Sequence, residues 1–283
     1  MSYAKPESLV ETGWLAANLN RVKVLDASWY LPAQKRDAKA EFAAAHVPGA
    51  QFFDIDAISD RDTTLPHMLP SAEAFGRAVG ALGVSSGDRV VIYDGAGLQG
   101  AARVWWTFRA FGHRDVAILN GGFVKWMAEK RPTESTVRPA KPARFHARLE
   151  TSLVRDLAAM KANVTSKVEQ VLDARPRGRF AGTEPEPRPG LRSGHIPGSR
   201  CLPSAELIDA NAKTVRPAAD LRALFTGAGI DLAKPIATTC GSGITASALA
   251  FGLYLVGHER WAVYDGSWAE WGAQADTPVA TGT

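Results

Sequence analysis

The sequence predicts an α/β protein built from two homologous domains, each a parallel sheet flanked by helices. Two observations support this prediction. The same short motifs occur in the same order in both halves of the 283-residue chain, and short β-rich apolar runs alternate with longer helical patterns. A solenoid would need shorter units and at least three of them, so two copies of about 140 residues indicate two domains.

The repeated motifs define where the two copies begin and end. The matched pairs are VLDA at 24–27 and 171–174, HVPGA at 46–50 and HIPGS at 195–199, Asp94 and Cys240, His113 and His258, and NGGFVKW at 120–126 and DGSWAEW at 265–271. Between the copies lies a stretch with several prolines and dispersed charges, which is typical of a linker. We therefore expect an N-terminal domain at 1–133, a linker at 134–149 and a C-terminal domain at 150–283.

Each copy contains the alternation that a parallel sheet covered on both faces requires. The expected strands are 22–27, 89–93 and 116–119 in the first copy, and 169–173, 235–239 and 261–264 in the second. The expected helices are 72–82 and 101–111, with counterparts at 218–226 and 245–256. The helices follow the strands in both copies, which favours a doubly covered sheet over an antiparallel one.

Composition and charge exclude several classes of protein. With 46% hydrophobic and 22% charged residues the chain is an ordinary globular protein, and its net charge of +4 comes from scattered basic residues, which argues against nucleic-acid binding. No apolar run reaches the length of about 18 residues that a membrane span needs, and no targeting segment is visible, so we expect a cytoplasmic protein. The two cysteines lack CxxC or zinc-finger spacing, and we expect no metal and no organic cofactor.

Cys240 has the sequence context of a nucleophile. The expected strand ending at Thr239 runs into Cys240 and a glycine-rich loop, CGSGIT at 240–245, and then into an apolar helix. Ligands bind at the carboxyl ends of parallel strands, and the N–H groups of such a loop can converge on an anion, which lowers a thiol pKa. The alternative is a small buried cysteine without function. Cys201 follows the HIPGS turn without a glycine-rich loop, and we interpret it as structural.

Counting along the chain separates the possible cysteine chemistries. A cysteine phosphatase needs an arginine six positions after the nucleophile, where this chain has Ala246. An acyl-transfer enzyme needs a nearby base, but His258 matches His113 in the copy that has no such cysteine, which indicates a structural role for both. A thiolate surrounded by N–H groups without an adjacent base is suited to carrying a sulfur atom as a persulfide.

These residues also resemble a known family. The CGSGIT loop, the GHIPGS turn, the GRF-x-GTEPEPR stretch at 178–188 and the duplication resemble the tandem-domain rhodanese superfamily, in particular its 3-mercaptopyruvate sulfurtransferases, from about residue 8 to residue 275. The resemblance implies transfer of sulfur from 3-mercaptopyruvate, through a Cys240 persulfide, to thioredoxin, a small thiol or cyanide, with release of pyruvate. Asp94 cannot accept sulfur, so the first domain is expected to be non-catalytic.

The loop residues bear on which sulfurtransferase this is. Thiosulfate sulfurtransferases of the family typically carry basic residues in the two positions after the cysteine, whereas this chain has Gly241 and Ser242. The neutral loop favours mercaptopyruvate, and Ile244 in place of the usual valine changes little. The alternatives are a thiosulfate sulfurtransferase and a non-catalytic sulfur carrier or interaction module.

The resemblance also implies a substrate-binding set. Arg179 and Arg188 match the family's substrate-carboxylate arginines, and a planar guanidinium can meet a carboxylate with two parallel hydrogen bonds. From the residues alone, either arginine could instead pair with Glu184 or Glu186. The loop residues expected to line the substrate are Gly241, Gly243, Ile244 and Thr245.

A proton relay is the last implied element. In the resembling family, the residues that match Ser242, His67 and Asp56 are proposed to protonate the product enolate. From the residues alone, His67 could be a surface histidine beside Pro66 and Asp56 a helix cap. Asp54 is a competing partner for His67, and spacing does not choose between the two carboxylates.

Overall fold

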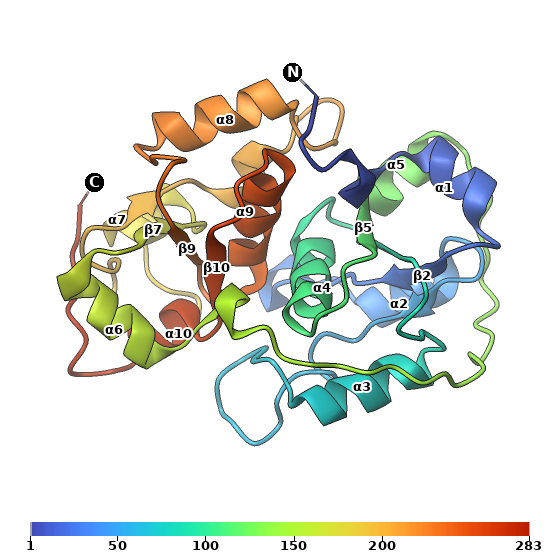
Figure 1. The fold of residues 1–283 in the computed structure, drawn as a ribbon, viewed down its shortest axis with the longest axis horizontal. Helices are drawn as coiled ribbons and strands as arrows, with labels where there is room; N and C mark the ends of the chain where they lie inside the picture. The colour runs from blue at the N-terminus through green and yellow to red at the C-terminus, as the bar shows by residue number, and fades with distance from the viewer. Residues whose placement is uncertain (1, 283) are drawn as a thin grey trace.

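The structure, a computed structural model, describes residues 2–282 and contains two domains that each hold a five-stranded parallel sheet (Figure 1). The strand orders are β1-β5-β4-β2-β3 and β6-β10-β9-β7-β8, so the second sheet repeats the first. The N-terminal strands are β1 (Leu9–Val10), β2 (Lys23–Asp26), β3 (Gln51–Phe52), β4 (Val90–Tyr93) and β5 (Val116–Leu119). The C-terminal strands are β6 (Val154–Arg155), β7 (Gln170–Asp173), β8 (Arg200–Cys201), β9 (Ile236–Thr239) and β10 (Trp261–Tyr264).

Helices connect the strands in both domains. The first domain contains α1 (Thr12–Asn18), α2 (Ala38–Ala44), α3 (Ala72–Ala81), α4 (Gln99–Ala110) and α5 (Gly122–Ala128). The second contains α6 (Leu157–Ser166), α7 (Arg177–Ala181), α8 (Ala218–Gly227), α9 (Ile244–Leu255) and α10 (Ser267–Trp271). Short 3-10 helices lie at Pro6–Ser8, Pro32–Gln34, Thr151–Leu153 and Ser204–Leu207. Within residues 2–282, no helix combines the length and the apolar character needed to cross a bilayer.

The predicted α/β fold with two parallel sheets is confirmed. Every strand and helix predicted from the pattern is present, with ends within two residues of the expected ones. The structure adds the two-residue edge strands β1, β3, β6 and β8 and several short helices. These elements are too short to show a hydrophobic period, because a two-residue strand contributes no alternation to a sequence pattern.

The segment between the domains is extended and attached to the first domain. It forms no helix or named strand after α5 and before Thr151. The backbone N–H of Ala143 donates to the carbonyl of Gly80 at 2.9 Å, and the Phe145 ring is buried against Phe75 and Phe108. The connection therefore packs along α3 before the second domain begins.

Helices α4 and α9 pack against each other at the centre of the molecule and join the two domains (Figure 1). The Trp105 ring lies 4.9 Å from Phe251, 5.2 Å from Tyr254 and 5.6 Å from Trp261, measured between ring centroids. One buried apolar cluster includes side chains of both sheets and of both central helices. We therefore expect the domains to behave as one rigid unit.

The domain interface is approximately symmetric. The N–H of Val215 donates to the Asn120 side chain at 2.9 Å, and the N–H of Leu69 donates to the Asp265 side chain at 2.7 Å. Asn120 and Asp265 begin the matched NGGFVKW and DGSWAEW motifs, and both donors lie in the opposite domain. Corresponding surfaces of the two copies therefore face each other.

Candidate active site

Cys240 lies directly after the central strand β9 and is 1% exposed. The carbonyls of Cys240 and Gly241 accept hydrogen bonds from the N–H groups of Trp268 and Ala269, each at 2.9 Å. Because the C=O and N–H of a trans peptide point in opposite directions, the N–H groups of Gly241 and Ser242 point away from α10 and into the loop. Gly243 has φ +80° and is the N-cap of α9. The N–H groups of the first turn of α9, which have no partner within the helix, therefore lie next to the same loop.

The equivalent loop of the first domain shows what such an arrangement binds. The Asp94 carboxylate accepts hydrogen bonds from the N–H groups of Ala96 and Ala101, both at 2.9 Å, and from Gly97. The Asp94 carbonyl accepts from Phe123 at 2.9 Å, as the Cys240 carbonyl does from Trp268. The first loop is thus an anion site occupied by its own side chain, which fits the expected absence of sulfur chemistry in this domain.

The two cysteines occupy different environments. Cys201 ends the edge strand β8, and its thiol lies 3.5 Å from the carbonyl of Arg175. Burial raises the pKa of Cys201 to about 11, so its thiol stays protonated at neutral pH. Cys240 instead begins a loop of inward N–H groups at the start of a twelve-residue helix. Only Cys240 has the setting of a thiolate nucleophile.

Both predicted substrate arginines lie beside the cysteine loop. A Cβ on Gly241 would lie 3.0 Å from Nη2 of Arg179 and 3.7 Å from Nη1 of Arg188, so the two guanidinium groups converge on the residue after the nucleophile. Burial lowers the pKa of Arg188, and the repulsion of Arg179 adds to this, while the nearby Cys240 opposes it. Within residues 2–282, Arg188 makes no ion pair. An anion bound here would complete its charge balance.

A buried charge network holds Arg179 in place. Arg175 pairs with Asp173 and with Glu186, each at 2.7 Å, and the other Glu186 oxygen lies 2.5 Å from Nη2 of Arg179. The sequence left open whether Arg179 pairs with Glu184 or Glu186. The structure contains the pair with Glu186, and this pair fixes the position of the arginine. Arg175 was not among the residues predicted from the sequence. It follows the second VLDA motif, where the first copy has Ser28, and this difference between copies was the available signal.

His67 and Asp56 come together at the first domain's side of the site. The Nδ1 atom of His67 lies 2.9 Å from Oδ1 of Asp56, and Trp29 Nε1 donates to the other Asp56 oxygen at 3.2 Å. Asp54 instead pairs with Lys39 at 2.5 Å, so the geometry selects Asp56. Burial lowers the pKa of His67, which Asp56 only partly offsets, so the imidazole is neutral at pH 7.

The remaining predicted residues lie in or next to the loop. Ser242 is buried, at 5% exposure, and Ile244 and Thr245 open helix α9. In the described part of the chain, no hydrogen bond joins Ser242 to His67. The structure therefore places His67 and Asp56 together, while Ser242 lies in the loop of Cys240. The charges of Arg103 and, to a smaller extent, Arg188 add to the lowering of the His67 pKa that burial causes.

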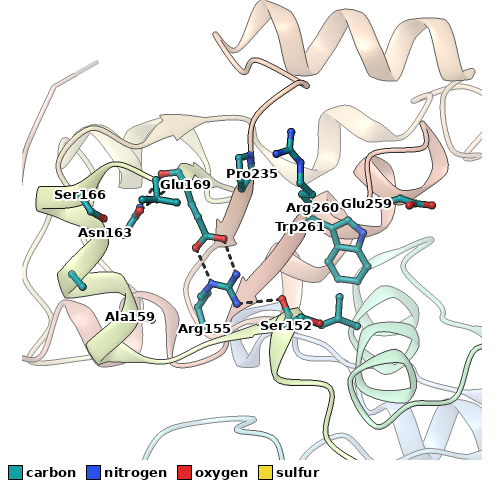
Figure 2. Close-up of a pocket in the computed structure, with 13 residues that line it drawn as sticks. Ser152, Arg155, Ala159, Asn163, Ser166, Glu169, Pro235, Glu259, Arg260 and Trp261 are labelled. Carbon is teal, nitrogen blue, oxygen red and sulfur yellow. Dashed lines mark hydrogen bonds and ion pairs between the residues drawn. The ribbon is translucent and has the colours of Figure 1, made fainter.

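Other polar features are structural. His46 and His195 each present Nδ1 to the carbonyl of a phenylalanine, at 2.7 and 2.8 Å, and stack on that ring, as expected for repeated turn residues. A hollow of about 560 Å³ lies at the amino ends of β9 and β10 (Figure 2), whereas Cys240 follows the carboxyl end of β9. Its charged residues Arg155 and Glu169 pair at 2.8 Å. Since ligands of parallel sheets bind at the carboxyl ends, we do not assign this hollow to the reaction.

These observations define a two-domain α/β protein with two equivalent loops. The loop of the second domain begins with a cysteine, and the loop of the first domain is filled by its own carboxylate. The model of the rhodanese-like domain matches residues 11–129 and 155–274, and the chain belongs to the rhodanese family. It is 46% identical to the 3-mercaptopyruvate sulfurtransferase of Rattus norvegicus, over 93% of this chain and 91% of that protein.

Two further similarities frame the choice of function. The chain is 45% identical to the thiosulfate sulfurtransferase of Cricetulus griseus, over 97% of this chain and 96% of that protein. Its structure matches that of SseA from Escherichia coli, described as a 3-mercaptopyruvate sulfotransferase, with a TM-score of 0.85 and 34% identity over 92% of this chain and 98% of that one. Overall identity therefore does not separate the two sulfur donors.

Proposed function

We propose that this protein is a 3-mercaptopyruvate sulfurtransferase in which Cys240 carries the sulfur. The observation that carries the proposal is the pairing of a cysteine loop without charged residues with two arginines that converge on Gly241. The loop suits a thiolate, and the arginines suit the substrate carboxylate. The sulfurtransferase names of the relatives agree with this class of reaction.

The first half-reaction moves one sulfur atom. The Cys240 thiolate attacks the thiol sulfur of 3-mercaptopyruvate, a sulfur–sulfur bond forms, and the carbon–sulfur bond breaks with its electron pair going to the carbon. Arg179 and Arg188 hold the substrate carboxylate during this step. The products are the Cys240 persulfide and a pyruvate enolate, and the thiol proton of the substrate is sufficient to convert that enolate into pyruvate.

His67 is the proposed carrier of that proton. A neutral imidazole oriented by Asp56 can take the thiol proton and return it to the enolate carbon, with Ser242 as the connecting hydroxyl. The buried and unpartnered Nε2 atom is available for this exchange, while Nδ1 faces Asp56. The transfer is internal, so the half-reaction consumes no external acid.

In the second half-reaction, a thiol takes the outer sulfur. An acceptor thiolate attacks that sulfur, and the Cys240 thiolate leaves, which restores the enzyme in a ping-pong cycle. We propose thioredoxin, a small thiol or cyanide as acceptors. Turnover measured with each of the three in competition would identify the preferred one.

Mass spectrometry tests the sulfur-carrying role directly. Incubation with 3-mercaptopyruvate without an acceptor is expected to add the mass of one sulfur atom to the peptide that contains Cys240. Pyruvate should be released in equal amount. Release of pyruvate without the added mass, or neither event, would reject the persulfide mechanism and favour a non-catalytic module.

Thiosulfate is the competing donor. Gly241 and Ser242 offer no cation beyond the two arginines, so the small dianion should be captured less well than mercaptopyruvate. Comparison of kcat/KM for the two donors decides between them. A clear preference for thiosulfate would make the protein a thiosulfate sulfurtransferase.

We also propose a cytoplasmic location. Both cysteines in the described residues are free thiols, as is usual in reducing compartments. Cell fractionation followed by immunoblotting would test this, and enrichment in an organelle fraction would contradict it.

A further inference from the structure

A buried ion pair crosses the domain interface next to the active site. Nη1 of Arg103, on helix α4, lies 2.8 Å from Oδ1 of Asp265, which follows strand β10 in the other domain. The two side chains are 3% and 4% exposed. The sequence analysis assigned no role to either residue.

This pair contacts both halves of the catalytic arrangement. Nη2 of Arg103 donates a hydrogen bond to the carbonyl of His67, and the second Asp265 oxygen accepts from the N–H of Leu69 at 2.7 Å. On the other side, a Cβ on Gly243 would lie only 2.5 Å from Nη1 of Arg103 and 3.0 Å from the Asp265 carbonyl. The pair therefore lies between the His67 segment and the loop of Cys240.

The backbone of His67 needs such support. His67 has φ +64°, a left-handed conformation that residues with a side chain rarely adopt. The hydrogen bonds from Arg103 and to Asp265 fix the peptide units that follow this residue. Because this backbone sets the direction of the imidazole, they also fix its position against Asp56.

The other side of the pseudo-symmetric interface lacks this pair. Asn120 corresponds to Asp265 and accepts from Val215, and the offset of 145 residues that aligns the start of α4 with that of α9 aligns Arg103 with Ala248. The residues that correspond to the pair are thus a neutral amide and an alanine. Since buried ion pairs add little net stability, the charges on the catalytic side need another explanation.

We propose that Arg103 and Asp265 are positioning residues that hold His67 against the Cys240 loop for the proton transfer. This inference rests on the proposed sulfurtransferase function. The pair acts through His67, whereas binding of the substrate carboxylate depends on Arg179 and Arg188, which it does not contact.

The test is the double variant Arg103→Ala/Asp265→Asn, which copies the residues at the symmetric position, Ala248 and Asn120. It removes both charges, so no unpaired buried charge remains, and Asn at 265 can still accept from Leu69. We expect kcat for pyruvate release from mercaptopyruvate to fall about tenfold or more, while KM changes less than about twofold. An unchanged kcat would overturn the inference.

A second measurement separates positioning from a general structural effect. In a His67→Ala background, the double substitution should cause no further loss of kcat, because its route of action is already absent. A further loss of similar size would show that the pair acts elsewhere and would also overturn the inference. An inactive wild-type protein would instead reject the proposed function.

Arg103→Lys provides the same test with the charge retained. A lysine can pair with Asp265, but its single ammonium nitrogen cannot occupy both the Nη1 and the Nη2 position of the arginine, so an intermediate kcat is expected. If thermal unfolding shows that the double variant is not folded, this variant decides. Wild-type kcat in Arg103→Lys, or a loss that persists without His67, would then contradict the proposal.

Discussion

The loops after β4 and β9 are the most informative comparison in this molecule. Both follow the central strand of a sheet. In both, the carbonyl of the first loop residue, Asp94 or Cys240, accepts a hydrogen bond at 2.9 Å from an N–H group of a following helix, α5 or α10. They differ in the first side chain, where Asp94 fills its own loop and Cys240 leaves an equivalent loop for a reacting sulfur. The fold therefore supplies the same loop twice, and we expect the residue at its first position to decide whether the loop performs chemistry.

The largest expected effect comes from the residue that distinguishes the loops. Cys240→Ser should reduce pyruvate release to below about one thousandth of the wild-type rate, because a hydroxyl does not ionise at neutral pH. Cys201→Ser is the matched control and should retain activity, since the pKa of Cys201 is raised to about 11. A coupled assay for pyruvate would measure both. Loss of activity in Cys201→Ser with activity retained in Cys240→Ser would mean that the roles of the two cysteines are exchanged.

The second prediction tests whether the first domain contributes to the reaction through His67. His67→Ala should lower kcat about a hundredfold, the usual scale for a positioned acid or base, with a smaller change in KM. Steady-state kinetics with mercaptopyruvate would measure the effect. A change confined to KM would place His67 in binding and leave the chemistry entirely to the second domain.

The third prediction concerns the segment at 178–188, which the first copy lacks. Arg179→Lys and Arg188→Lys keep the charge but lose the planar fork, and each should weaken substrate capture by about 1 to 3 kcal/mol, seen as a rise in KM of about tenfold. Arg177→Lys is the control on the same helix, since Arg177 is exposed and pairs with Glu206. Wild-type KM in both site variants would place the carboxylate elsewhere.

The last comparison concerns stability rather than activity and involves Asp26 and Asp173, the aspartates of the two VLDA motifs. Asp173 is fully buried and paired with Arg175, so Asp173→Asn should lower the free energy of unfolding by about 3 kcal/mol. Within residues 2–282, Asp26 pairs with no cation, and burial raises its pKa to about 6, so Asp26→Asn should raise the free energy of unfolding by up to about 3 kcal/mol at pH 7. Urea denaturation would measure both.

The stability difference between Asp26→Asn and the wild type should depend on pH. Between the unfolded pKa near 4 and the folded pKa of about 6, the folded state binds more protons, so the stability that this group contributes is lost as pH rises through 6. The advantage of Asp26→Asn over the wild type should therefore grow from pH 4 to pH 7 and then level off. A difference independent of pH would show that ionisation of Asp26 is not its cause.

The sequence predicts the longer strands and the central helices because each of these elements contains enough residues to show a hydrophobic period. It does not predict two-residue edge strands such as β3, nor the pairing of His67 with Asp56 over Asp54, because both carboxylates precede the same turn and only the folded chain separates them. Arg175 was not found although the signal was local, since it replaces Ser28 of the first copy and its partner Asp173 is two residues away. Arg103 was not found because its partner lies in the other domain, and no local pattern connects an arginine in α4 to a carboxylate after β10.

The approximate symmetry of the interface has a consequence for how such a site can arise. In a homodimer formed by two identical subunits, every contact on one side of the two-fold axis is repeated on the other side, so a charged pair would occur twice. Duplication within one chain removes this constraint, because each position is encoded twice. The two sides have accordingly diverged here: Arg103 pairs with Asp265 on one side, while Asn120, the counterpart of Asp265, accepts a hydrogen bond from Val215 on the other.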